Sequence, residues 1–133
     1  MVLVDTSVLI DYFKAADTKE TALLDALLDA GVSILIGDLV LMELLQGVRS
    51  DEQVRLVLQE LSVYPTITIG GPECTIQAAH HNRQLRGIGI TPRKCIDTLI
   101  ATRCILEDIP LHFSDRDFEP FVQHLGLARA TLS

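Results

Sequence analysis

The sequence predicts an α/β fold, a three-layer α/β/α sandwich around a central, mostly parallel sheet of four or five strands. Short apolar runs of strand length alternate along the chain with longer segments whose apolar residues recur at helical spacing. The first run, residues 2–4, shows no polar alternation, which is typical of a strand buried on both faces of a parallel sheet. It stops at Asp5, and the carboxyl edge of such a sheet is where ligands and catalytic groups gather.

The first half of the chain predicts four helices and a second strand. An apolar stripe over residues 6–14 predicts a helix that directly follows Asp5. The spacing of a capping box at residues 17–20, followed by a leucine stripe, predicts a second helix that ends at Gly31. The second strand is expected over residues 32–36, and two further apolar stripes predict helices over about residues 38–48 and 51–61.

The second half repeats the alternation. A third strand is expected over residues 65–69, before the turn residues Gly70, Gly71 and Pro72. Two helices are expected next, then a fourth strand and a short helix that reaches Phe121. Their predicted ranges are about 73–86 and 93–107 for the helices and 111–113 for the strand, and residues 127–131 are expected to add an edge strand.

Composition bounds the class of protein. A chain of 133 residues with 48% hydrophobic and 22% charged residues is expected to fold as one globular domain, residues 1–133. The sequence contains no membrane-length apolar run and no basic signal segment at its start, so we expect a cytoplasmic protein without membrane association. The three cysteines are odd in number and form no C-x-x-C pair, which predicts reduced thiols. The histidines show no zinc-finger spacing.

The formal net charge of −7 argues against binding of nucleic acid by general electrostatics. However, no acidic residue lies between Glu73 and Asp97, and four cationic residues fall within that interval. They are Arg83, Arg86, Arg93 and Lys94. The segment is either a local site for phosphate groups or a solvated helix face followed by a basic loop, and the sequence supports both interpretations.

Four carboxylates stand out against this framework. Asp5 and Asp115 each follow an apolar strand, so the two meet if those strands are neighbours. Glu43 and Asp97 interrupt apolar helices, where a buried charge is costly unless it is paired or binds a metal ion. For either helix residue alone, exposure to solvent is the better explanation. All four together form the set of oxygen ligands that a hard divalent cation requires.

With these motifs in place, the chain resembles the PIN-domain ribonucleases, and especially the VapC-type toxins of bacterial and archaeal toxin–antitoxin pairs. The resemblance covers essentially the whole length. It rests on the order and spacing of five segments, which are Val4–Asp11, Leu41–Gly47, Leu85–Ile88, Ile96–Thr102 and Phe113–Phe118. The chain departs from the family pattern at residues 112–114 and 101–102. These departures are expected to change the shape of the pocket more than its chemistry.

The resemblance implies an endoribonuclease that depends on Mg²⁺ or Mn²⁺. The family's acidic positions match Asp5, Glu43, Asp97 and Asp115, with Asp5 and Asp97 as direct metal ligands. Glu43 and Asp115 then complete the acidic pocket or act through bound water. The supporting positions implied are Thr6 or Ser7, the small hydroxyl residue beside the first aspartate, and Asp117, beside Asp115. The residues expected to bind RNA phosphates on either side of the cleaved bond are Arg83, Arg86, Arg93, Lys94 and Arg116.

Partners also follow from the resemblance, which implies a small antitoxin protein that inhibits the enzyme and a homodimer. The leucine-rich helices of residues 6–30 and 38–62 suit such interfaces, although core packing explains them as well. The residues argue against two other functions. A phosphoaspartyl transferase normally carries a second aspartate two residues after its nucleophile, where this chain has Ser7. A non-catalytic PIN-fold module that binds RNA or protein has no physical need to retain four clustered carboxylates.

Overall fold

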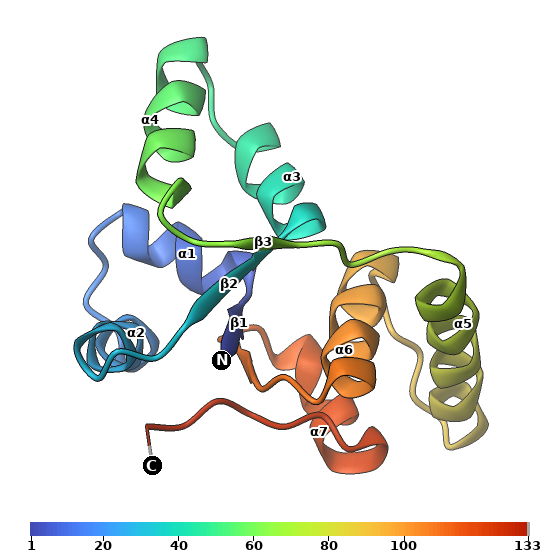
Figure 1. Cartoon of the computed structure of the whole chain (residues 1–133). Coiled ribbons are helices and arrows are strands. Elements are labelled where there is room, and N and C mark those ends of the chain that lie inside the picture. The colour runs from blue at the N-terminus through green and yellow to red at the C-terminus, as the bar shows by residue number, and fades with distance from the viewer. Residues whose placement is uncertain (133) are drawn as a thin grey trace.

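Four parallel strands form the centre of the protein (Figure 1), whose structure is a computed structural model that describes residues 1–132. The strands are β1 (Val2–Val4), β2 (Ile34–Gly37), β3 (Thr66–Ile67) and β4 (Leu111–His112), in the order β3-β2-β1-β4. All three pairings are parallel. The predicted α/β class and the parallel sheet are therefore confirmed.

Helices flank the sheet on both sides. They are α1 (Thr6–Phe13), α2 (Lys19–Asp29), α3 (Asp38–Gln46), α4 (Asp51–Leu61), α5 (Pro72–Gly87), α6 (Cys95–Glu107) and α7 (Glu119–Leu125), with a 3₁₀ turn, η1 (Arg116–Phe118). In Figure 1, α1 and α2 lie to one side of the strands, and α6 and α7 lie to the other with α5 outside α6. Helices α3 and α4 project from the sheet as a pair. None of the helices within residues 1–132 has the length and apolar character that a bilayer-spanning segment requires.

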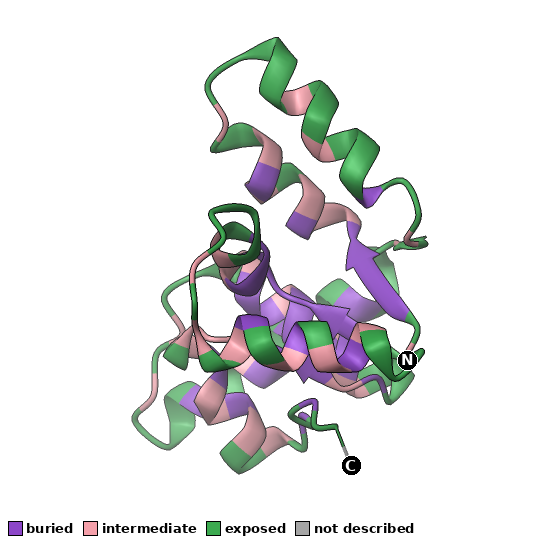
Figure 2. Cartoon of the chain, turned by 90° about the vertical axis from the view of Figure 1, so that its left-hand side faces the viewer, coloured by how far each residue is buried: buried purple, intermediate pink, exposed green. Residues whose placement is uncertain are grey.

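The core is built on the central strands. Every residue of β1 and β2 is buried (Figure 2), as the run without polar alternation predicts. Two of the three free thiols, Cys74 and Cys104, pack in the interior, while Cys95 is exposed. Those two cysteines therefore pack as small apolar residues.

Strand β1 lies between β2 and β4, and this position brings three chain segments to one edge of the sheet. Leu3 is aligned with both Leu35 and Leu111. The strands run in the same direction, so the residues that follow β1, β2 and β4 emerge side by side. Asp5 follows β1 here, helix α3 follows β2, and the Ser114–Asp115 turn follows β4.

The structure corrects three details of the sequence prediction. The expected edge strand at 127–131 is a single bridge from Leu111 to Arg129, because only Leu111 pairs with this segment. The capping box of α2 is formed by Thr18 and Thr21 rather than by residues 17 and 20, since each threonine hydroxyl accepts a hydrogen bond from the other residue's amide. Helix α6 begins two residues later than expected, at Cys95.

Candidate metal centre

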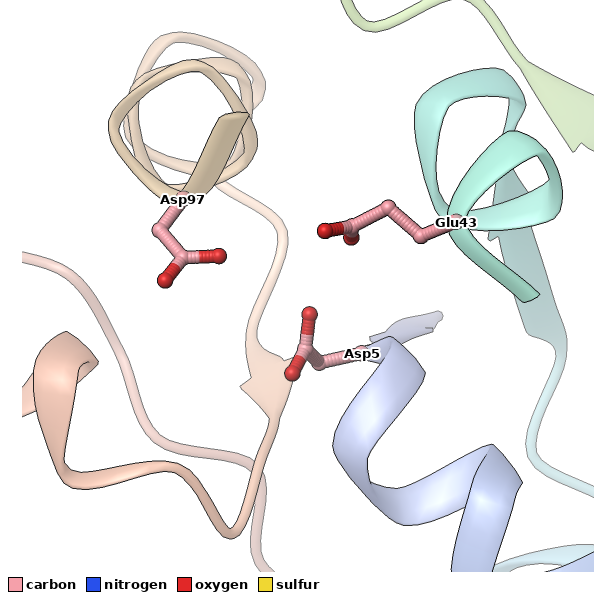
Figure 3. Close-up of side chains that lie close together, drawn as sticks. All are labelled: Asp5, Glu43 and Asp97. Atoms are coloured by element: carbon pink, nitrogen blue, oxygen red, sulfur yellow. The ribbon is translucent and has the colours of Figure 1, made fainter. Parts of the chain in front are cut away.

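Three carboxylates from distant parts of the chain meet at the carboxyl edge of the sheet. Asp5, Glu43 and Asp97 each offer an oxygen atom, and these atoms lie within 4.8 Å of one another. Figure 3 shows the three side chains pointing toward a common centre from the start of α1, from α3 and from α6. We call these three residues the inner acidic group.

Asp5 is fixed by the first turn of α1. Its Oδ2 accepts hydrogen bonds from the Ser7 backbone amide at 3.2 Å and from Ser7 Oγ at 2.7 Å, so Asp5 caps the helix. Ser7 Oγ also accepts a bond from the Ser114 amide, which ties the segment after β4 to the same corner. Asp5 Oδ1 is buried and has no hydrogen-bond partner among the described residues. Burial raises the pKa of Asp5 despite the bonds from Ser7.

Glu43 is half-buried and reaches the centre from α3. Thr6 Oγ1 donates a hydrogen bond of 2.9 Å to Glu43 Oε1. The start of α3 is anchored by Asp38, whose Oδ1 accepts from the amides of Leu39 and Ile69. Ile69 packs so closely on Gly37 that a β-carbon there would lie 2.8 Å from its side chain. The glycine therefore permits the contact that sets the direction of α3.

Asp97 occupies the first turn of α6 and is 6% exposed. Burial, together with the nearby charge of Asp5, raises its pKa to about 7. Its Oδ2 has no hydrogen-bond partner among the described residues, although Lys94 Nζ lies 3.9 Å away. A distance of 3.9 Å allows electrostatic attraction but is too long for a hydrogen bond.

Asp97 also belongs to a second cluster, which we call the outer acidic group. Oxygen atoms of Asp97, Asp115 and Asp117 lie within 4.8 Å of one another. Lys94 Nζ donates to Asp115 Oδ2 at 3.2 Å, and Arg93 forms an ion pair of 3.1 Å with Asp117. Burial alone would raise the pKa of Asp115, but the Asp117 amide and Lys94 outweigh it and lower that pKa.

The inner acidic group fits a divalent cation. Within residues 1–132, the only buried side-chain oxygen or nitrogen atoms without a hydrogen-bond partner are Asp5 Oδ1 and Asp97 Oδ2, which belong to two of its three members. A buried, unpartnered carboxylate oxygen costs free energy unless a cation or a proton satisfies it. Carboxylate oxygens are the ligands that Mg²⁺ and Mn²⁺ prefer. The structure thus brings together Asp5, Glu43 and Asp97, and places Asp115 beside Asp97.

The predicted basic residues fall into two sets. Arg83 and Arg86 line a groove of about 420 Å³ between α5 and α6, and neither guanidinium forms an ion pair or hydrogen bond with another residue of 1–132. Arg93 and Lys94 are instead paired with carboxylates, and Arg116 lines a hollow of about 190 Å³ with them. The sequence analysis missed the approach of Lys94 to Asp97, although the spacing of three residues between them is a signal that indicates it.

The protein belongs to the PIN-domain family. The family model of the PIN domain matches residues 2–121, which is most of the chain and includes all four predicted carboxylates. This confirms the family that the sequence motifs indicated.

Solved structures share the fold over nearly the full length. The VapBC2 complex of Rickettsia felis, bound to a DNA fragment of its promoter, contains a chain that is 22% identical, with a TM-score of 0.75 and 98% of each chain covered. A toxin–antitoxin complex of Klebsiella pneumoniae gives 21% identity and a TM-score of 0.68, covering 100% of this chain and 98% of that one. VapC20 of Mycobacterium tuberculosis, described as a toxin that cleaves the sarcin–ricin loop, gives 14% identity, a TM-score of 0.69 and 98% coverage of each chain.

Proposed function

We propose that the protein is a metal-dependent endoribonuclease and the toxin of a type II toxin–antitoxin pair. The observation that carries the proposal is the inner acidic group, in which Asp5 and Asp97 each present a buried, unpartnered oxygen on a PIN fold. Two of the similar structures are toxin–antitoxin complexes, and VapC20 is described as a toxin that cleaves the sarcin–ricin loop. The proposed enzyme acts on RNA in the cytoplasm.

Each acidic residue has a proposed part. Asp5 and Asp97 hold Mg²⁺ or Mn²⁺ directly, since each has a buried, unpartnered oxygen and each offers an oxygen to the cluster with Glu43. Glu43 and Asp115 complete the acidic pocket. The supporting residues are Thr6, which orients Glu43, Ser7, which orients Asp5, and Asp117, whose amide donates to Asp115.

The chemistry required is hydrolysis of a phosphodiester bond. A bound divalent cation lowers the pKa of water and offsets the charge that develops on the phosphoryl oxygens. The chain's own contribution is to hold the carboxylates rigidly, because each is fixed by a hydroxyl, a helix start or a neighbouring strand end. This arrangement needs no histidine. His81 and His112 are buried and engage Thr102 and the Glu20 carbonyl respectively.

We propose that Arg83 and Arg86 hold the RNA backbone. Both are exposed, and the groove that they line also includes the apolar residues Ala78, Ala79 and Leu99. Its wall includes Cys95, Thr98 and Leu99 of α6, the helix that also carries Asp97. An unpaired guanidinium is well suited to a phosphate oxygen.

We further propose an antitoxin partner and a homodimer. A groove of about 520 Å³ between α1, α3 and α4 is lined by Ile10, Phe13, Leu44 and Leu56 and extends to Glu43. A largely apolar groove of this kind suits an amphipathic helix, and because Glu43 also lines it, an antitoxin bound there would lie beside the acidic pocket. Exposed apolar residues on neighbouring faces, including Met42, Leu58 and Val63, suit a second copy of the chain.

The test is incubation of the purified protein with total RNA in Mg²⁺, in Mn²⁺ and in EDTA, followed by mapping of the cut ends. We expect discrete internal cuts with either ion and none in EDTA. Asp97→Asn should abolish cutting, whereas Asp108→Asn, the same change at an exposed position that ends the same helix, should retain it. Retention of RNA without cutting under all conditions would instead support a non-catalytic RNA-binding module.

A further inference from the structure

The two acidic groups differ in the cations that the chain itself supplies. Arg93 and Lys94 both pair with the outer acidic group, through Asp117 and Asp115. No Lys, Arg or His of residues 1–132 forms an ion pair with Asp5 or Glu43. Asp97, which belongs to both groups, is the point where the Lys94 ammonium approaches the inner one.

Lys94 is held at this boundary by its place in the chain. It is the N-cap residue of α6, so its side chain leaves the backbone one turn before Asp97. Nζ lies 3.2 Å from Asp115 Oδ2 and 3.9 Å from Asp97 Oδ2, between the end of β4 and the start of α6. These carboxylates raise the pKa of Lys94, led by the hydrogen bond with Asp115. Both contacts favour the ammonium form of Lys94.

We propose that the Lys94 ammonium takes the place of a second divalent cation in the outer acidic group, so that the protein binds a single divalent ion in the inner acidic group. The proposal rests on the proposed metal-dependent function and specifies how many divalent ions each chain binds. Nucleases with two metal ions hold them about 3.5–4 Å apart. An ion bound by Asp97 and Asp115 would lie beside the ammonium that those two carboxylates hold, and the like charges would repel strongly.

This role differs from the one that the sequence predicted for Lys94. A lysine that holds RNA needs an ammonium free to meet phosphate, whereas this one is engaged by two carboxylates of the site. Arg116 is the useful contrast, because it lines the same hollow as Lys94 and forms no ion pair with the described carboxylates. Removing either charge changes the net charge equally, but only Lys94 occupies the outer acidic group.

The test is isothermal titration calorimetry of the full chain with Mn²⁺ alone, without RNA. We expect one Mn²⁺ per chain for the wild type and for Arg116→Met, and two for Lys94→Met, with the added ion bound more weakly than the first. Lys94→Gln serves as a second variant that keeps a polar side chain. Since the Lys94 side chain is 53% exposed, both substitutions should leave the fold intact, as circular dichroism would verify.

Thermal denaturation supplies a second readout. In EDTA, Lys94→Met should melt below the wild type, because Asp115 and Asp97 lose their cation, and saturating Mn²⁺ should raise its melting temperature more than that of the wild type. Two Mn²⁺ per wild-type chain would overturn the proposal while leaving a metal-dependent nuclease intact. One Mn²⁺ per chain in both Lys94 variants would also overturn it. Absence of Mn²⁺ binding by the wild type would refute the proposed metal dependence itself.

Discussion

The inner and outer acidic groups share Asp97 but stabilise their charges in opposite ways. The inner group is more deeply buried, and two of its oxygens have no hydrogen-bond partner among the described residues. The outer group is partly exposed and is balanced by Lys94 and Arg93. Proximity of carboxylates therefore does not by itself define a metal centre. What distinguishes the inner group is that no Lys, Arg or His of residues 1–132 forms an ion pair with Asp5 or Glu43.

The directions of the pKa shifts follow from this difference. Burial raises the pKa of Asp5, and burial with the charge of Asp5 raises that of Asp97 to about 7. Hydrogen bonds and a lysine lower the pKa of Asp115 against the effect of burial. A divalent ion bound by the inner group would stabilise its ionised form, whereas in the outer group Lys94 already favours the ionised form of Asp115.

The largest expected effect comes from removing the charge that the two groups share. Asp97→Asn should reduce cleavage by more than the roughly 10–100-fold that is typical of losing a residue that only supports a ligand. In EDTA the same variant should melt several degrees higher than the wild type, because repulsion with Asp5 and the desolvation of a buried charge are removed. Single-turnover cleavage and differential scanning calorimetry measure the two effects. A melting temperature lowered by several degrees would show that Asp97 is a structural hydrogen-bond acceptor.

The stability of the chelated wild type should decrease as pH rises. Asp97 has a pKa of about 7 in the fold against an ordinary value of 3.8, so the folded state binds its proton more tightly than the unfolded chain. The protonated Asp97 therefore contributes fully to the free energy of unfolding below about pH 4, and this contribution is lost as the pH rises through 7. With allowance for solvent screening, we expect the free energy of unfolding to fall by roughly 2 kcal/mol. Asp115 has the opposite effect, because its pKa is lowered in the fold. Its contribution to stability is present above its ordinary pKa of 3.8 and is lost as the pH falls below that value.

Urea unfolding in EDTA at about pH 5 and pH 8 checks this dependence, with Asp97→Asn as the control that should lose most of it. Equal slopes against pH in the two proteins would contradict the origin assigned to the effect.

An intermediate effect is expected from the hydroxyl that orients Glu43. Thr6→Val removes the 2.9 Å bond to Glu43 Oε1 while keeping the size of the side chain. Affinity for Mn²⁺ and cleavage should each fall by roughly 10–100-fold, as is typical for a residue that orients a metal ligand. Thr66→Val is the matched control, since Thr66 is exposed on β3 and Glu43 Oε1 is bonded by Thr6 instead. Equal behaviour of the two variants would exclude an orienting role for Thr6.

The smallest effect is expected in the groove between α5 and α6. Replacing Arg83 and Arg86 together with alanine should weaken RNA binding several-fold and reduce the slope of log affinity against log salt by at most about 1.4, or about 0.7 per phosphate contact on a single strand. Catalysis at saturating RNA should change little, because neither side chain contacts a carboxylate of the site. Fluorescence anisotropy across a salt series tests this. An unchanged slope would assign the RNA path to another surface.

Much of the fold and of the inner group was predictable from local patterns. The strand of residues 2–4 that ends at Asp5 and the apolar helices that contain Glu43 and Asp97 are local signals, and the parallel sheet brings them together. The contact of Lys94 with Asp115 was not predictable, because it depends on the path of a long side chain across a turn between distant segments. The prediction of an edge strand at 127–131 was wrong for a similar reason. Its pairing depends on a distant segment, and only Leu111 of that segment pairs with it.

The most direct test of the account is the position of a bound ion. Crystals grown with Mn²⁺ and measured at the manganese absorption edge should show one anomalous peak per chain, in contact with Asp5 and Asp97, with Lys94 still paired to Asp115. A peak held by Asp115 and Asp117 with Lys94 displaced, or no peak near Asp5, would contradict it.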